Sequence, residues 1–522
     1  MKKIIGLMIT ITFCSPVIAQ IGNQWQKTYG GTDSDWANYI VLTSDGGFII
    51  TGFTESFGVG GTDVYLIKTN YYGDTLWTRT YGGLGDDEGQ VVRQTNDGGY
   101  IIGATTNSFV PGNQLDLYLI KTDSVGNLIW SKTYGNFYLE IPTVIEITAD
   151  GGYVINIDYQ GLMKVDGIGN MIWIRKYGST FPYVVKSFKA TNDGGFILTG
   201  IKDTSFSSLE RIFLLKTDSI GNPLWSKLYM DTSYNTYGLS LCITNDNGYA
   251  IIGQRQDINT IHFINFLKTD SNGNLIWYKQ IEAISHPATR GTFIQQTADG
   301  GYMLTGFRDN GASNDIHLTK SDSNGTLIWS KIIGTFNGDE ITYCCQQTSD
   351  QGYITSCTTA GFGDPTGDVY LIKTDSNGTS GCNESNLSAW FTNINTTTVS
   401  YPVTVNSVTL TITTPSTITG SSNVTITLLC PILTGIFSSI ELYAGFNLFP
   451  NPATEQLIID NGELKIERVE IYDVVGEKII HYPLSIFNSQ LTIDVSALPS
   501  GIYFITVTDD AGNRVVRKVV KM

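Results

Sequence analysis

The 522-residue sequence predicts an all-β protein: a seven-bladed β-propeller, then a β-rich connector and a small C-terminal β-sandwich. The main support is a tryptophan that recurs at intervals of 52, 53, 43, 52, 52 and 52 residues, at Trp25, Trp77, Trp130, Trp173, Trp225, Trp277 and Trp329. An Asp-Gly-Gly type of turn and a Lys-Thr-Asp type of signal recur in step with it. A period near 50 residues with several short strands per unit is typical of propeller blades, not of helical solenoids.

Each unit contains four short segments rich in β-branched and aromatic residues, bounded by Gly, Asp and Asn. In the first unit they span 39–43, 48–52, 64–68 and 75–79. The third segment is apolar at successive positions, so both of its faces should be covered. Blades packed face to face around an axis provide that cover.

The two ends of the repeat region, residues 22–379, complement each other. The seventh unit reaches Gly378 but lacks the segment that carries the tryptophan, whereas residues 24–29 form a spare segment of that type. The N-terminal segment is therefore predicted to close the ring as the outer strand of the blade containing 369–373, which removes an exposed sheet edge. The short interval of 43 residues is predicted to reflect only a trimmed loop between Ile157 and Leu162.

Composition limits the location and the partners of the protein. A net charge of −16 and an isoelectric point near 4.7 argue against nucleic-acid binding, which needs a basic face. Residues 1–19 combine two lysines, an apolar core and a small-residue cleavage site, so they are predicted to be a signal peptide. No later segment reads as a membrane-spanning helix. A secreted or cell-surface protein, exported first to the periplasm, is expected.

Residues 380–445 form a connector rich in Thr and Ser, with prolines that interrupt extended segments. A β-rich connector and a partly disordered linker both remain open. Cys382 and Cys430 flank a cysteine-free stretch and are predicted to form a disulfide, which the exported compartment permits. The adjacent Cys344 and Cys345 are expected to be separate thiols, because neighbouring residues of a strand point to opposite faces.

Residues 446–522 alternate like short strands and are predicted to fold as a separate β-sandwich. They contain Pro450-Asn451-Pro452, Tyr472-Asp473-Val474-Val475-Gly476, Leu498-Pro499-Ser500-Gly501-Ile502-Tyr503 and a basic tail. This combination resembles the C-terminal sorting domain of proteins exported by the type IX secretion system. The resemblance implies that the secretion machinery is a partner and that the protein is released or attached at the cell surface.

The repeats also resemble those of quinoprotein-type propellers, which carry Asp, Gly and Trp around the same hairpin, as Asp123, Gly126 and Trp130 do here. Enzymes of that family use a quinone cofactor with calcium. No catalytic residue, cofactor-binding set or metal ligand can be carried over to this chain, so no cofactor is predicted, and calcium is left as an option. The repeated Asp-Ser-Asn-Gly stretches are interpreted as hairpin turns, since they are too short for a calcium loop.

The repeated lysine at the end of the third segment is predicted to pair with the aspartate of the Asp-Gly-Gly turn. In each unit, the turn between the first and second segments and the turn between the third and fourth lie on one rim. The longer loop between the second and third segments and the crossover to the next unit lie on the other rim. Variable loops on a rigid scaffold commonly carry function. The predicted ligand-binding residues on this variable rim are Asp35, Trp36, Asp86, Asp87, Asp339 and Glu340.

The leading hypothesis is a non-catalytic binding or adhesion module, with a glycan or a surface protein as its ligand, because aromatic rings beside carboxylates suit sugars. A quinoprotein-like or polysaccharide-degrading enzyme is the alternative. A clustered, inward-facing set of carboxylates, His or Arg at the axis of the variable face would favour that enzyme. A surface-layer scaffold and a merely solvated acidic rim are the other interpretations.

Overall fold

The computed structural model describes residues 24–109, 115–135, 140–157, 161–178, 183–203, 209–231, 233–257, 261–283, 289–335, 338–406, 411–415, 417–420, 424–429, 447–449, 455–460, 466–472, 478–486, 490–499, 501–509 and 514–521. The chain divides into two compact units, Met1–Ile432 and Leu433–Met522. The predicted signal peptide, residues 1–19, lies outside the described residues.

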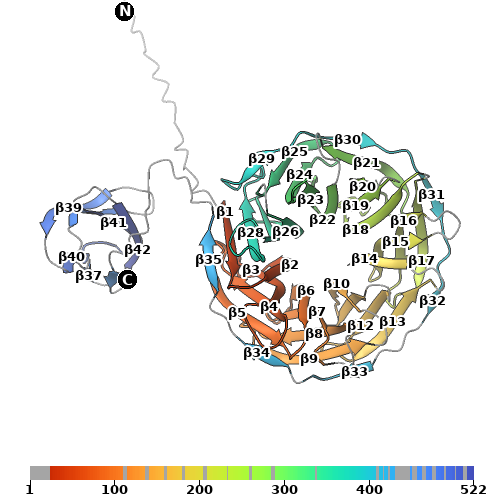
Figure 1. Ribbon diagram of the computed structural model, residues 1–522, viewed down its shortest axis with the longest axis horizontal. Coiled ribbons are helices and arrows are strands. Elements are labelled where there is room, and N and C mark those ends of the chain that lie inside the picture. The colour runs from red at the N-terminus through yellow and green to blue at the C-terminus, as the bar shows by residue number, and fades with distance from the viewer. Residues whose placement is uncertain are drawn as a thin grey trace, which may run out of the picture. The chain divides into compact units, whose positions relative to one another are not determined.

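The first unit is a ring of seven blades, each an antiparallel sheet whose first strand lies innermost (Figure 1). The blades contain, in order, β2 (Asp35–Leu42), β3 (Phe48–Thr54), β4 (Asp63–Thr69) and β5 (Thr75–Gly82); β6 (Asp87–Gln94), β7 (Tyr100–Thr106), β8 (Asp116–Thr122) and β9 (Leu128–Gly135); β10 (Pro142–Ile147), β11 (Tyr153–Ile157), β12 (Gly161–Val165) and β13 (Met171–Tyr177); β14 (Tyr183–Ala190), β15 (Phe196–Asp203), β16 (Glu210–Thr217) and β17 (Pro223–Met230); β18 (Asn235–Ile243), β19 (Tyr249–Gln256), β20 (His262–Thr269) and β21 (Leu275–Ala283); β22 (Thr289–Gln296), β23 (Tyr302–Asp309), β24 (Asn314–Ser321) and β25 (Leu327–Ile333); β26 (Glu340–Gln347), β27 (Tyr353–Thr359), β28 (Asp368–Thr374) and β1 (Trp25–Gly30). The predicted seven-bladed propeller is confirmed.

The N-terminal strand closes the ring. β1 pairs antiparallel with β28, from Trp25 opposite Lys373 to Tyr29 opposite Val369, as the sequence predicted. Its buried Gln26 accepts a hydrogen bond of 2.5 Å from the Tyr370 hydroxyl and donates one of 2.6 Å to the Cys382 carbonyl. β1 is not the outermost strand of its blade, however, because a connector strand pairs with its other edge.

The short third blade keeps all four strands, β10 to β13, as predicted. The shortening is not confined to the loop, since β11 and β12 have five residues each where β3 and β4 have seven. The prediction that only the loop is trimmed was therefore wrong. Two paired strands can be shortened by the same number of residues and still keep their register. The loop residues 158–160 lie outside the described residues.

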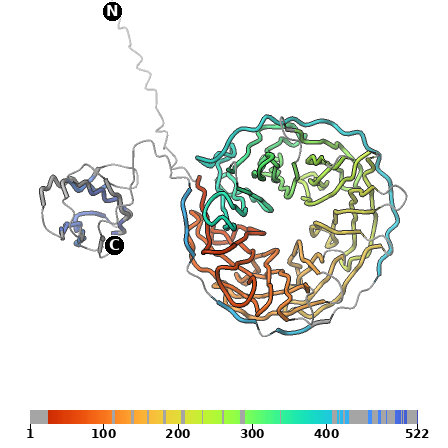
Figure 2. The backbone as a smooth tube through the Cα atoms, in the orientation of Figure 1, coloured from red at the N-terminus to blue at the C-terminus, as the bar shows by residue number. Residues whose placement is uncertain are grey.

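The connector is a belt around the propeller (Figure 2). Its strands add a fifth strand to every blade, running backwards from the sixth blade to the first and ending on the seventh. They are β29 (Glu384–Asn386), β30 (Ala389–Asn393), β31 (Thr397–Ser400), β32 (Val405–Asn406), β33 (Thr411–Thr413), β34 (Ile418–Gly420) and β35 (Thr425–Leu428). The described residues between 384 and 428 therefore form a β-rich connector. Its strands pair with the outer edges of the blades, which would otherwise be exposed.

Each blade is joined to the next by a tryptophan and a glycine. The glycine of the turn before the fourth strand has φ between 69° and 81°, and its Cα lies against the tryptophan of the preceding blade. The pairs are Trp25–Gly73, Trp77–Gly126, Trp130–Gly169, Trp173–Gly221, Trp225–Gly273, Trp277–Gly325 and Trp329–Gly378. In five of these contacts a buried tyrosine four residues after the tryptophan also donates to the glycine carbonyl, as Tyr81 does to Gly126 at 2.6 Å.

The predicted lysine–aspartate pairs are present in all seven blades, with N···O distances of 2.5–2.9 Å. They join Lys68–Asp45, Lys121–Asp97, Lys164–Asp150, Lys216–Asp193, Lys268–Asp246, Lys320–Asp299 and Lys373–Asp350. In six blades the lysine is buried near the end of the third strand, where the carboxylate and the adjacent backbone carbonyl accept its hydrogen bonds. Lys164 is half-buried.

The C-terminal unit has two antiparallel sheets that share one hydrophobic core. One contains β36 (Asn447–Phe449), β37 (Gln456–Asp460) and β40 (Gln490–Asp494), and the other β38 (Ile466–Tyr472), β39 (Lys478–Ile486), β41 (Gly501–Asp509) and β42 (Arg514–Lys521). Leu457 and Ile459 of the first sheet pack with Val469 and Ile471 of the second, as expected for a sandwich.

Cys382 is disulfide-bonded, and its Sγ lies 3.5 Å from the carbonyl of Leu429. Cys430 lies outside the described residues, so its pairing with Cys382 remains a prediction. Cys344 and Cys345 are separate free thiols, as expected. A Cys382–Cys430 bond would tie the start of the belt to its end.

We expect replacement of both Cys382 and Cys430 by Ser to lower the free energy of unfolding of the propeller by about 2–4 kcal/mol, because the link restricts the unfolded belt. Thermal unfolding with and without reductant measures this loss. Reductant should leave the double variant unchanged, which is the control. Peptide mass mapping that finds both cysteines free in the unreduced protein would rule out the pairing.

The turn aspartates predict a loss of stability in acid. Hydrogen bonds from Lys216 and Thr191 lower the pKa of Asp193 to about 2, from an ordinary value of 3.8. The pair therefore contributes stability above about pH 4, and the contribution disappears as the pH falls from about 4 to about 2. Because Asp193 is 60% exposed, Asp193→Asn should cost no more than about 1 kcal/mol at pH 7. As the pH is lowered from about 4 to about 2, the unfolding midpoint of Asp193→Asn should fall less than that of wild type. The midpoint of Asp203→Asn, an exposed control, should fall as much as that of wild type.

Candidate functional site

A pocket of about 430 Å³ lies on the propeller axis. Its wall is built by the first strands of all seven blades, β2, β6, β10, β14, β18, β22 and β26, with Phe53 added from β3. In β2 the lining side chains Trp36 and Asn38 alternate with the buried Asp35 and Ala37, as the two faces of a strand require. Trp36 and Glu88, near the starts of β2 and β6, place one end of the pocket near the variable rim, and Lys189 and Leu241 extend it along the axis.

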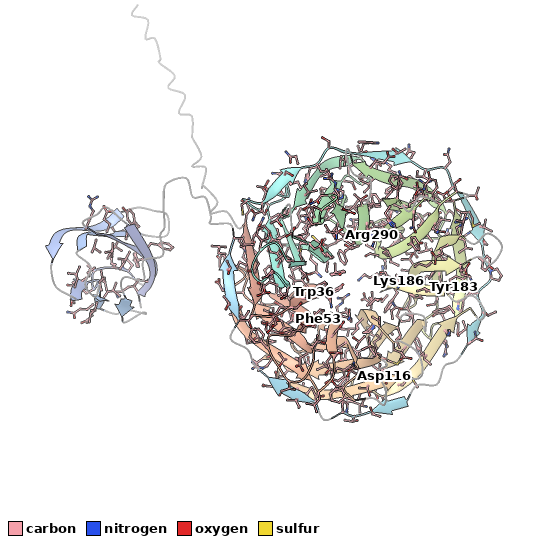
Figure 3. All side chains as sticks on the ribbon, in the orientation of Figure 1. Trp36, Phe53, Asp116, Tyr183, Lys186 and Arg290 are labelled. Carbon is pink, nitrogen blue, oxygen red and sulfur yellow. The ribbon has the colours of Figure 1, made fainter. Side chains whose placement is uncertain are left out.

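Aromatic rings lie at this end of the axis. Trp36 and Phe53 are cross-strand partners whose rings stack at 5.6 Å between centroids and 17° between planes. Tyr343 of β26 is 37% exposed on the same pocket wall. Figure 3 shows Trp36 and Phe53 near the central opening, with Lys186 and Arg290 on its other sides.

Polar groups complete the wall. Asn38 donates to the Gly89 carbonyl at 2.9 Å, which links the first two blades, and Gln90 donates to Glu88 at 3.2 Å. Burial raises the pKa of Glu88. Glu88 is the one carboxylate among the lining residues, and no histidine is among them.

A second axial pocket of about 440 Å³ lies toward the rim of the Asp-Gly-Gly turns. There Glu146 pairs with Lys189 at 2.8 Å and approaches Arg93 at 3.9 Å. The Arg93 guanidinium also lies 4.8 Å from the centre of the Tyr39 ring. The two cations share one carboxylate, so the axial wall is more basic than the rest of this acidic chain.

Three of the predicted ligand residues are fully buried: Asp35, Asp87 and Glu340. Each begins a first strand and accepts a backbone N–H from the preceding crossover, as Asp35 does from Gly31 at 2.7 Å and Asp87 from Gly83 at 2.8 Å. A serine or threonine hydroxyl of the same blade donates to each as well. These three buried side chains do not reach the surface where a ligand could contact them, and their carboxylates instead hold the crossovers in place.

The other three predicted residues are accessible. Asp86 and Asp339 are exposed on the rim, where they accept hydrogen bonds from Asn107 and Asn314 respectively. Trp36 is half-buried and is the predicted residue that lines the axial pocket. Their role in ligand binding remains a proposal.

Sequence reasoning missed most of the pocket. Asn38, Gln90, Lys186 and Tyr343 were not selected, although each lies on the first segment of a repeat. The signal that could have found them is the position: polar side chains with a period of two on the innermost strand must face the axis.

The opposite rim, which carries the Asp-Gly-Gly turns, has a row of exposed apolar side chains. The residue before the tryptophan is a strongly exposed aliphatic side chain, 54–59% accessible, in six blades. These residues are Leu76, Ile129, Ile172, Leu224, Ile276 and Ile328. The sequence analysis did not predict this regular apolar row on the surface.

Within the described part of the chain there is no group of three or more His, Cys, Asp or Glu side chains placed to hold a metal. No helix among those residues has the length and apolarity needed to cross a bilayer.

Residues 447–522 match the family described as the secretion system C-terminal sorting domain. This domain implies export by the type IX secretion system to the outer surface or the extracellular space. No curated protein matches the chain.

Solved structures resemble the chain only at low identity and with TM-scores below 0.5. PorZ, a surface component of the type IX secretion system of Porphyromonas gingivalis, has 9% identity and a TM-score of 0.40 over 94% of this chain and 60% of PorZ. The chain thus spans about three fifths of the PorZ length. YCF48 bound to a D1 peptide has 9% identity and a TM-score of 0.40, covering 68% of this chain and 98% of YCF48. The extracellular domain of a putative hybrid two-component system, BT3049 from B. thetaiotaomicron, has 8% identity and a TM-score of 0.31, covering 93% and 68%.

Proposed function

We propose that the propeller is a non-catalytic binding module whose ligand, a glycan or a surface protein, contacts the axial pocket and the adjoining variable rim. The observation that carries this proposal is the pocket wall, where the stacked Trp36 and Phe53 adjoin amide, hydroxyl and charged groups from other blades. Aromatic faces with a few polar groups are typical of ligand sites. The quinoprotein-like or polysaccharide-degrading alternative gains little from a wall with one carboxylate and no histidine.

Trp36→Ala should weaken binding of a ligand found on glycan and protein arrays by at least about tenfold, because a buried aromatic contact commonly contributes 2 kcal/mol or more. Binding of the purified propeller is measured by calorimetry. Trp390→Ala is the matched control, since Trp390 is an exposed tryptophan of the outer belt. Asp86→Asn and Asp339→Asn should reduce binding to a smaller extent. Loss in the Trp390 variant with an unchanged Trp36 variant would place the site elsewhere.

The sorting domain should be needed for export and not for the fold of the propeller. The propeller and the C-terminal unit have separate hydrophobic cores. Truncation before residue 446 is therefore expected to leave a folded protein in the periplasm, with an unfolding midpoint close to that of the same domain in the full chain. Cell fractionation and limited proteolysis measure both. Normal surface display of the truncated protein would contradict this role.

A further inference from the structure

The two axial pockets adjoin each other, and together they form what we call the axial recess. Tyr39, Lys189 and Phe293 line both pockets. The recess extends from Trp36, near the start of β2, to Gln296 at the end of β22. A ligand that enters at the variable rim can therefore meet side chains of both pockets.

The axial recess carries more positive than negative side chains. Its charged lining residues are three cations and two carboxylates, namely Arg93, Lys186, Lys189, Glu88 and Glu146. The whole chain, in contrast, has 32 Lys and Arg against 48 Asp and Glu. A local excess of positive charge in such an acidic chain attracts anions to the axis.

Three of these charged groups lie at equivalent positions of neighbouring blades. Arg93, Glu146 and Lys189 each stand four residues before the aspartate of the Asp-Gly-Gly turn, on β6, β10 and β14. Lys189 Nζ donates to Glu146 Oε1 at 2.8 Å, and a guanidinium nitrogen of Arg93 lies 3.9 Å from the same oxygen. One carboxylate thus serves two cations, and the three groups together carry one excess positive charge.

The cations lie at two depths along the axis. Lys186 precedes Lys189 by three residues on β14, so it lies roughly 10 Å nearer the variable rim at about 3.3 Å per residue. Figure 3 shows Lys186 at the central opening, across from Trp36. Lys186 is half-buried, and the side chain of Lys189 is 34% exposed. A ligand in the axial recess can therefore reach both lysines.

Neutral hydrogen-bonding groups accompany the cations. Asn38 and Gln90 line the outer pocket together with Trp36. In the inner pocket, the side-chain carbonyl of Gln295 accepts the N–H of Gln347 at 2.8 Å, so its NH₂ group retains donors for another partner. Amide groups suit the hydroxyls of a sugar ring, and an aromatic face suits its C–H surface.

We propose that the axial ligand is an acidic glycan, whose carboxylates pair with Lys186 and Lys189 while a sugar ring packs against Trp36. This inference rests on the binding function proposed above and specifies the class and charge of the ligand. Hydrogen bonds from a lysine to a carboxylate are about twice as strong as neutral ones. Acidic protein segments also offer carboxylates, but an aromatic and amide lining in a pocket of about 430 Å³ favours small polar rings.

The test compares charged and uncharged forms of the same sugars. Oligosaccharides of galacturonate, glucuronate, mannuronate and guluronate, each with its methyl ester, are titrated by calorimetry into the full-length mature protein. At least one uronate should bind at least about tenfold more tightly than its ester, which cannot accept a charge-assisted bond. This advantage should shrink as NaCl is added, because salt screens accessible charges.

Variants assign the charge preference to the axial recess. Lys186→Gln and Lys189→Gln should each weaken uronate binding by at least about tenfold, with little effect on the ester. Lys227→Gln is the matched control and should bind as wild type, since Lys227 lies on β17, the fourth strand of the same blade. Glu146→Gln should strengthen uronate binding, because it removes the carboxylate that competes for Lys189. A merely structural role of these residues would not produce that gain.

The outcomes separate this inference from the function on which it rests. Equal affinity for uronates and esters, with both lost in Trp36→Ala, would overturn the acidic glycan and leave the binding function intact. Failure of every uronate up to millimolar concentration, with Trp36-dependent binding of a neutral glycan or an acidic peptide, would do the same. Absence of Trp36-dependent binding of any probe would overturn both.

Discussion

Each tryptophan of the repeat needs a glycine in the following blade, and the propeller depends on this contact. The indole ring occupies the space where a Cβ atom would stand, and the glycine has a positive φ that other residues rarely adopt. The lack of space for a Cβ atom and the positive φ therefore both favour glycine at this position. Because the partner is always in the next blade, the contact couples neighbours around the ring, and an open chain of blades would leave one tryptophan and one glycine unmatched.

Closure satisfies that last contact. Trp25, carried on β1 in the seventh blade, meets Gly73 of the first blade, so the strand that fills the last sheet also completes the ring of indole contacts. The belt then pairs the outer edges of the blades. Gln26 lies where these elements meet, since it bonds both to Tyr370 of the blade and to Cys382 at the start of the belt. One short N-terminal strand thus links the ring and its belt.

The parts of this fold that sequence reasoning predicted are those with a local and repeated signal. The tryptophan interval, the missing seventh segment and the lysine–aspartate spacing each specify a contact directly. The belt lacked such a signal, because strands of two to five residues, such as β32 and β34, expose much of their side chains and show no apolar alternation. The site was predicted only in part. An acidic residue at a strand start, such as Asp87, has the same sequence signature whether it fixes a crossover or meets a ligand.

Residues that are repeated in every blade determine the fold, whereas residues that differ between blades determine which groups the axis presents to a ligand. Trp36, Glu88 and Arg290 occupy the second position of their first strands and are therefore structural equivalents. The contacts between blades keep these positions on the axis but do not specify their chemistry. A ring of similar scaffolds consequently has an asymmetric inner wall, with an aromatic, an acidic and a basic side chain at equivalent depths. A ligand on the axis meets a different group on each side, which gives a repetitive fold the variety that specific binding requires.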